Sequence, residues 1–262
     1  MLPCFAAIAF DYATVRGNTR PVALRVDCGD GVEDGYMVKM RAGFRDHYSG
    51  PLNEAVCSLL AQRLGLDVPK PAVIDVGNEF YRCIPDSEPD RKEYTRNSVG
   101  PNFGCQNLGA DWKTWLPNRR PSPGQRDAAA AIFAFDALVQ NSDRGRENPN
   151  LLYSGSVLVA YDHENTFGYL RRIPSTGFPW SFETRYMLRE HIFFQQLKAS
   201  QVSFAPFCDA LEALSDRDLA EIEECIPVEW HNGDDLPLTI EYIRRVRNRC
   251  SEFADSLLDA LP

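Results

Sequence analysis

Three polar side chains suited to phosphoryl transfer lie within and just after one polar loop. Asp143 is followed five residues later by Asn148, and Asp162 stands directly after the apolar stretch 157–161. One aspartate can orient or accept the proton of an attacking hydroxyl, while an asparagine and a second aspartate supply the hard oxygen ligands that Mg²⁺ takes beside ATP phosphates. Such a loop taken alone predicts only capping and turns. Its place between an apolar helix and an apolar strand favours the catalytic interpretation.

A lysine and a glutamate that could complete this chemistry precede the loop in the chain. Lys39 lies in the apolar run 36–40, where an unpaired ammonium would be costly. Glu54 stands near the start of the next predicted helix. A strand lysine paired with a glutamate of the adjoining helix is the ion pair that orients ATP phosphates in phosphoryl transfer. The competing interpretation of Lys39 is an outward-facing side chain on an edge strand.

The elements that must position these residues follow from the hydrophobic pattern. Strands are predicted at residues 1–10, 22–26, 36–40, 73–76 and 79–82, the first of them buried. A helix is predicted from Pro51 to Gly65. Prolines and glycines punctuate residues 85–124 and predict a linker with irregular structure. Further helices are predicted at 128–140, 183–199, 205–214, 216–225 and 238–261, with Ser215 as an N-cap.

This order of elements predicts an α+β fold with two lobes. Residues 1–84 form a small β-rich lobe that binds nucleotide, residues 85–104 form a hinge or linker, and residues 105–262 form a larger, mainly helical lobe that carries the catalytic loop. We expect the site in the cleft between the lobes. The arginine cluster in the last helix is expected to be a solvated or salt-bridged face.

Composition excludes several other classes of protein. The 262 residues carry a net charge of −9, which argues against strong general nucleic-acid binding. No apolar run approaches the ~20 residues that a membrane span needs. Eight cysteines without a C-x-x-C pair, and no secretory signal, predict reduced thiols in a cytoplasmic protein. The four histidines show no metal-ligand spacing.

The sequence also resembles a known family, the HipA-like kinases, a bacterial branch of the protein-kinase-like fold, over residues 15–250. The resemblance is carried by GYMVK at 35–39, NE at 53–54, LGLDVP at 64–69, FG at 103–104, NSDR at 141–144 with Asn148, YDHE at 161–164 and IPVEW at 226–230. The chain departs from the family at Gly145, where a histidine often stands. It also lacks the A-P-E segment of ordinary kinases.

This resemblance implies roles for individual residues. Lys39 would contact the α- and β-phosphates of ATP and Glu54 would hold it. Asp143 would be the catalytic aspartate, and Asn148 and Asp162 would bind Mg²⁺. The segment 16–21 stands where the family has its phosphate-covering loop, so three of its residues would contact the nucleotide: Gly17, Asn18 and Thr19. An antitoxin-type regulator is a further partner that the resemblance suggests.

The function expected from sequence is therefore an ATP- and Mg²⁺-dependent phosphotransferase that acts on a Ser or Thr hydroxyl of a protein. Three alternatives stay open. The first is a kinase-fold enzyme that phosphorylates a small molecule or a lipid head group. The second is a nucleotide-binding module without catalysis, and the third is a scaffold whose polar loops only cap helices.

Overall fold

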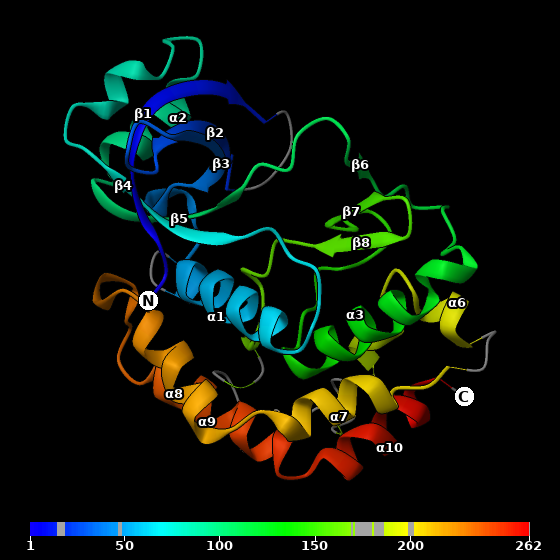
Figure 1. Ribbon diagram of the computed structural model, residues 1–262. Coiled ribbons are helices and arrows are strands. Elements are labelled where there is room, and N and C mark those ends of the chain that lie inside the picture. The colour runs from blue at the N-terminus through cyan, green and yellow to red at the C-terminus, as the bar shows by residue number, and fades with distance from the viewer. Residues whose placement is uncertain are drawn as a thin grey trace.

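The computed structural model describes residues 1–14, 19–46, 49–168, 170, 180, 186–198 and 202–261. An N-terminal β-rich region and a mainly helical C-terminal region lie one above the other (Figure 1). Two separate clusters of buried apolar side chains support them, a small one inside the strands and a larger one among the helices. The predicted division into a β-rich and a helical part is confirmed.

Five strands form the N-terminal region and close into a barrel in the order β1, β2, β3, β5, β4. The strands are β1 (Cys4–Ala13), β2 (Val22–Asp27), β3 (Glu33–Lys39), β4 (Pro71–Val76) and β5 (Gly100–Gln106). Closure follows because β1 pairs antiparallel with β2 and parallel with β4. A barrel this small is filled by its own side chains, which come mainly from Val22, Leu24, Val26, Val38, Ala72 and Ile74.

The structure corrects three of the predictions for this region. β1 is a strand, but its residues are half-buried or exposed rather than buried. Residues 79–82 do not form a strand, and a 3₁₀ helix, η2 (Phe80–Cys83), takes their place. Helix α2 (Pro89–Arg96) and strand β5 occupy much of the range assigned to a linker.

Strand β5 is hidden in the sequence by its proline and glycines, which ordinarily mark a loop. It nevertheless pairs with both β3 and β4. Gly104 is required by packing, since a Cβ there would lie 2.5 Å from Cγ1 of Ile74. The glycine therefore lets β4 and β5 approach inside the barrel.

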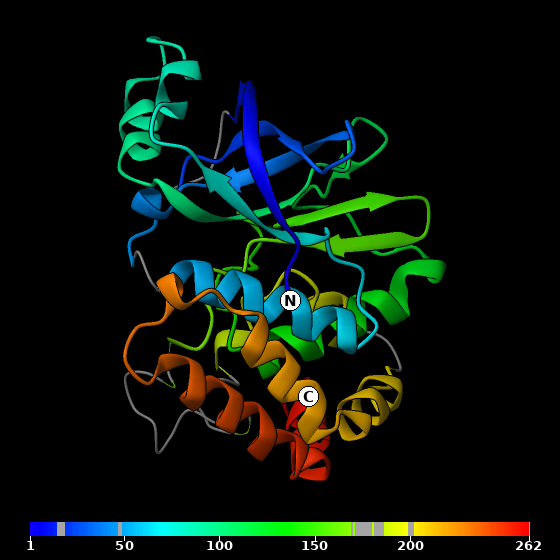
Figure 2. The same ribbon diagram turned by 60° about the vertical axis from the view of Figure 1, so that its left-hand side comes forward.

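Helix α1 (Ser49–Arg63) lies between the barrel and the C-terminal helices, as both views show (Figures 1 and 2). It begins two residues before Pro51, which the first helical turn tolerates because the N–H that proline lacks has no partner there. Most residues of α1 are buried, on all faces of the helix. Its apolar residues belong to the larger cluster, together with those of the C-terminal helices. The helix therefore joins the two regions.

The C-terminal region combines helices with a small sheet. Its elements are β6 (Lys113–Thr114), α3 (Arg126–Leu138), β7 (Leu151–Ser154), β8 (Val157–Ala160), α6 (Phe194–Lys198), α7 (Ala205–Ala213), α8 (Asp216–Cys225), α9 (Asp235–Arg247) and α10 (Cys250–Ala260). Ser215 caps α8 as predicted. Within the described residues, no helix is long and apolar enough to cross a membrane.

Two of the helix predictions need correction. The stretch 238–261 is not one helix, because α9 ends at Arg247 and α10 begins at Cys250. Of the predicted helix 183–199, residues 183–185 and 199 lie outside the described residues, and α6 covers only the later part. The arginine cluster is salt-bridged as expected, with partners Asp216, Glu241 and Glu252.

Candidate active site

Lys39 ends β3, and its buried ammonium is the centre of the site. Its side chain is only 11% exposed, and its Nζ contacts three carboxylates. The first belongs to Glu54 of α1. The others belong to the segment after β8, where Asp162 Oδ1 lies at 2.5 Å and Glu164 Oε2 at 3.1 Å from Nζ. The structure thus brings Lys39, Glu54 and Asp162 together, and adds Glu164.

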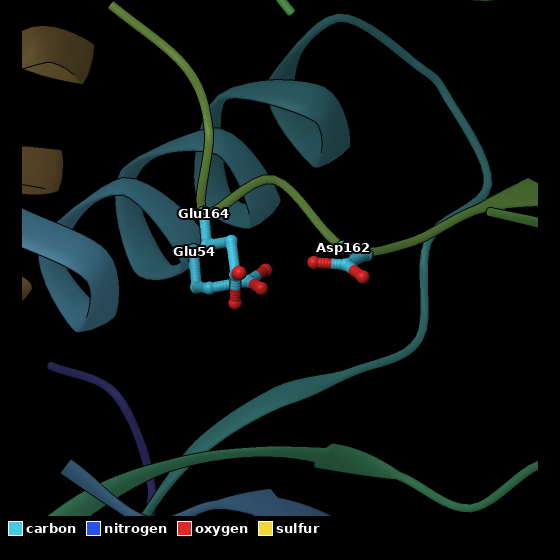
Figure 3. A group of neighbouring side chains, drawn as sticks. All are labelled: Glu54, Asp162 and Glu164. Atoms are coloured by element: carbon cyan, nitrogen blue, oxygen red, sulfur yellow. The ribbon is translucent and has the colours of Figure 1, made fainter. Parts of the chain in front are cut away.

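The carboxylates of Glu54, Asp162 and Glu164 point toward one another (Figure 3). One oxygen of each lies within 4.8 Å of the others. Burial raises the pKa of Glu54 to about 7 in spite of Lys39, and burial also raises the pKa of Glu164. For Asp162, burial is outweighed by the Lys39 ammonium, which lowers the pKa of that carboxyl. When all are ionised, one positive charge balances only one of three negative charges.

Such a donor set fits a divalent cation. Carboxylate oxygens are the ligands that Mg²⁺ takes in proteins, and the cluster carries more negative charge than Lys39 neutralises. Asp162 and Glu164 each use one oxygen on Lys39. Both oxygens of Glu54 are engaged, which leaves Asp162 and Glu164 as the better cation ligands.

Two consecutive residues of α1 hold the segment after β8 in place. Glu54 Oε2 accepts the backbone N–H of His163 at 3.0 Å. The side-chain amide of Asn53 donates to the carbonyl oxygens of Glu164 and Thr166, at 2.7 and 3.1 Å. Because both α1 side chains are buried, the position of Asp162 relative to Lys39 depends on this helix.

Asp143 lies in the loop between α3 and β7, where it gathers the other polar groups. Its Oδ2 accepts the side-chain amides of Asn148 at 3.0 Å and of Asn165 at 3.3 Å. Its own N–H donates to Asn141 Oδ1 at 3.0 Å, which fixes the turn. Asp143 and Asn148 therefore meet, and Asn165 links them to the segment that carries Asp162.

A buried ion pair lies beneath this loop. Arg144 Nε donates to Asp136 Oδ2 at 2.6 Å, and both side chains are fully buried. His191 Nε2 lies 2.9 Å from the same oxygen. Burial alone would raise the pKa of Asp136, but Arg144 and His191 lower it to about 2. Asp136 is thus a permanent carboxylate on α3, which anchors the loop.

A cavity of about 620 Å³ opens beside Asp143. Polar groups line most of it, among them Ser49, Asn53, Asp143, Glu164 and Asn165. A hydroxyl compound that entered this cavity would meet the carboxylate of Asp143, which is able to accept its proton. Glu164, one of the carboxylates that contact Lys39, also lines the cavity, so the cavity and the cluster share this residue.

The predicted phosphate-covering residues have different outcomes. Gly17 and Asn18 lie outside the described residues. Thr19 is buried, and its carbonyl oxygen would lie 2.9 Å from a Cβ on Gly43. Thr19 therefore packs against the turn that follows β3, and its contact with phosphate stays a prediction.

Sequence reasoning missed Glu164, Asn165 and the Asp136 ion pair. A usable signal existed for one of them. Asp136 is the single charged residue in the apolar stretch 128–140, and a buried charge requires a partner.

Comparisons with known proteins identify the family and the fold. A sequence profile of the family described as "HipA-like kinase" matches residues 14–254. The crystal structure of a Helicobacter pylori proinflammatory kinase, CtkA, superposes with a TM-score of 0.59 over 99% of this chain and 98% of that one, at 11% identity. At that identity the likeness shows the fold alone. No curated protein matches in sequence.

Proposed function

This chain belongs to the HipA-like kinase family, and from that premise we propose that it transfers the γ-phosphate of ATP to a Ser or Thr hydroxyl of a protein, with Mg²⁺. The observation that carries the proposal is the meeting of Lys39 with Glu54 and Asp162 beside the Asp143–Asn148 pair. Phosphoryl transfer is catalysed mainly by positioning and electrostatic stabilisation, and these groups supply both.

Each side chain has a defined part in this proposal. Lys39 binds the α- and β-phosphates while Glu54, fixed by the N–H of His163, holds the ammonium in place. Asp162 and Asn148 hold Mg²⁺, and the donor set around Asp162 supports Glu164 as a further ligand. When bound there, the cation would neutralise the charge that develops on the phosphate oxygens. Asp143 orients the acceptor hydroxyl and accepts its proton.

The cavity beside Asp143 supports a second candidate acceptor. A volume of about 620 Å³ lies within the range of about 300–1,000 Å³ that is usual for small-molecule sites. A small polyol or a lipid head group would present the same hydroxyl to Asp143. The catalytic residues are the same for both acceptors, so only the chemical nature of the labelled product separates them.

Transfer of ³²P from γ-labelled ATP tests the proposal. The purified chain is incubated with Mg²⁺ and three separate acceptor fractions: dephosphorylated bacterial proteins, small molecules and lipid vesicles. We expect Mg²⁺-dependent label on serine or threonine of proteins. Label confined to the small-molecule or lipid fraction would support the second candidate. No transfer to any fraction, together with no Mg-ATP binding, would contradict both.

Two variants show whether the activity comes from this site. Asp162→Ala removes a proposed metal ligand and should keep less than about a tenth of the turnover, a change of roughly 1.4 kcal/mol or more in the barrier. Asp75→Ala is the matched control, since it removes an exposed carboxylate from β4. It should leave turnover unchanged. Equal activity of the two variants would contradict the assignment of Asp162.

A further inference from the structure

Arg144 directly follows Asp143, and its buried guanidinium makes an unusual number of hydrogen bonds. Nε donates to the carboxylate of Asp136. The other two nitrogens reach four further partners: the carbonyl oxygens of Asn150 at 2.6 Å, Tyr161 at 3.2 Å and Pro149 at 3.3 Å, and His163 Nε2 at 3.0 Å. One side chain therefore contacts α3, the end of the catalytic loop and the segment after β8.

These partners lie next to the residues with proposed catalytic roles. Pro149 and Asn150 follow the metal-binding candidate Asn148, while Tyr161 and His163 stand on either side of Asp162. Arg144 itself follows Asp143. The guanidinium is thus a direct link between the catalytic loop and the segment that carries Asp162.

The linked segments also hold two residues in left-handed backbone conformations. Asn150 has φ 47° and Asp162 has φ 64°, a conformation that is uncommon outside glycine and that asparagine and aspartate tolerate better than other residues. Such conformations persist only where the surroundings determine them. Arg144 Nη1 binds the carbonyl oxygen of Asn150 and the carbonyl oxygen that immediately precedes Asp162. These hydrogen bonds oppose a return of the backbone at Asn150 and Asp162 to a more common conformation.

The surroundings of the guanidinium fix its position. Asp136, its counter-charge, also accepts the side-chain amide of Asn141 at 2.9 Å. The N–H of Phe193 donates to Nδ1 of His191, so Nε2 of that ring carries the hydrogen that is donated to Asp136. A planar guanidinium with all its nitrogens engaged in this way has one geometry available.

We propose that Arg144 is a positioning residue that sets the location of Asp162 relative to Asp143 and thereby shapes the divalent-cation site. The inference rests on the function proposed above. The hydrogen bonds of Arg144 go to Asp136, His163 and three carbonyl oxygens, and to none of the side chains proposed to hold the cation or the nucleotide. It acts through the carbonyl oxygens on both sides of the site, as outer-sphere partners do in metal sites, where their loss costs about 10–100-fold in metal affinity or activity.

Arg144→Lys tests the inference because it keeps the charge beside Asp136. A single ammonium cannot reach the carboxylate and the carbonyl oxygens of both segments at once. Mn²⁺ binding is measured by electron paramagnetic resonance in the presence of a non-hydrolysable ATP analogue, together with kcat and KM for Mg²⁺-dependent ATP hydrolysis. We expect about tenfold weaker Mn²⁺ binding and about a hundredfold lower kcat.

Leu257→Ala is the control for a merely structural effect. Leu257 is a fully buried residue of α10, and its truncation lowers stability without touching the loops. Mn²⁺ affinity per folded molecule should then equal that of the wild type. If Arg144→Lys does not fold, the double variant Asp136→Asn/Arg144→Gln removes both charges together, and we expect the same weaker Mn²⁺ binding from it.

Each outcome bears on one claim. A folded Arg144→Lys variant with Mn²⁺ affinity and kcat within about threefold of the wild type would overturn the positioning role. So would a loss of Mn²⁺ affinity that Leu257→Ala reproduces. Absence of nucleotide-dependent Mn²⁺ binding by the wild type would instead overturn the proposed function, and this inference with it.

Discussion

Two buried clusters in this protein pair a cation with carboxylates, and they do so in opposite ways. Around Lys39, three carboxylates share one ammonium. Around Arg144, one carboxylate pairs with one guanidinium, and a neighbouring histidine donates to the same carboxylate. The Lys39 cluster is short of positive charge, whereas the Arg144 cluster is balanced. A balanced pair suits a permanent support, and a cluster with surplus negative charge suits a site that binds a cation.

The carboxylate pKa values express the same difference. Asp136 and Glu54 are both fully buried, and burial alone raises the pKa of each. In Asp136 the Arg144 guanidinium and the hydrogen bond from His191 reverse this effect and lower the pKa to about 2. In Glu54 burial and the neighbouring Asp162 leave the pKa at about 7 although Lys39 opposes them. The carboxyl group of Asp136 therefore stays ionised at neutral pH, whereas the surroundings of Glu54 oppose its ionisation.

The largest effect is expected on stability, from Asp136→Asn. This change leaves the Arg144 guanidinium buried without its counter-charge, which costs about 3–5 kcal/mol of unfolding free energy. Glu164→Gln is the matched change in the Lys39 cluster. It removes surplus negative charge, so the unfolding free energy should change by less than about 1 kcal/mol. Urea denaturation at pH 7 measures both, and equal losses would contradict the contrast between the clusters.

A double-mutant cycle tests the pairing within the site. Lys39→Met and Glu54→Gln should each impair phosphate transfer, and the double variant should be little worse than either one. We expect a coupling of about 1–3 kcal/mol from the ratio of the four kcat/KM values. Additive losses would mean that the two side chains act independently.

Stability should also fall in acid earlier than the carboxylates alone predict. Burial and Arg144 lower the pKa of His163 from 6.5 to about 3, and burial lowers the pKa of His191. These two histidines therefore bind more protons in the unfolded chain than in the folded chain below pH 6.5, which lowers stability toward pH 3. Glu54 acts in the opposite direction below about pH 7, because its raised pKa keeps a proton on the folded chain. Each histidine contributes up to about 1.4 kcal/mol per pH unit. The stabilisation that comes from the lowered pKa of Asp136 is lost only when the pH falls below about 4.

Urea midpoints at pH 7.5, 6.0 and 5.0 measure this dependence. His191→Gln removes one buried histidine, so the urea midpoint should vary less with pH than it does in the wild type. His231→Gln changes an exposed histidine and should leave this pH dependence unchanged. A pH dependence that is the same in His191→Gln as in the wild type would contradict a buried neutral His191.

Much of the candidate site could be predicted because its residues end regular elements. Lys39 ends β3 and Asp162 follows β8, and hydrophobic periodicity locates both. Glu54 lies in a helix that several apolar residues before Gly65 indicate, although its buried face extends all round. Strand β5 could not be predicted, because its Pro101 and Gly104 are tolerated only by the pairing and packing of the closed barrel.

The contacts that Asp136 makes with Arg144 and His191 could not be predicted from the sequence, for a different reason. Asp136, Arg144 and His191 are brought together by tertiary packing, and no spacing in the chain reveals that a helix, a loop and a distant segment converge. Asp136 alone stands out, as a charge within an apolar helix. Its partners required the structure, as did the role of Glu164 beside Lys39.

Asp143→Asn provides the most direct test of a catalytic centre built on this loop. The change keeps the shape of the side chain and removes its charge and basicity. Phosphate transfer should fall by about 10²–10⁴-fold, while calorimetry with a non-hydrolysable ATP analogue and Mg²⁺ should show an affinity change below about 1 kcal/mol. Affinity that collapses together with turnover would make Asp143 a metal ligand. Unchanged turnover and affinity would contradict the catalytic assignment altogether.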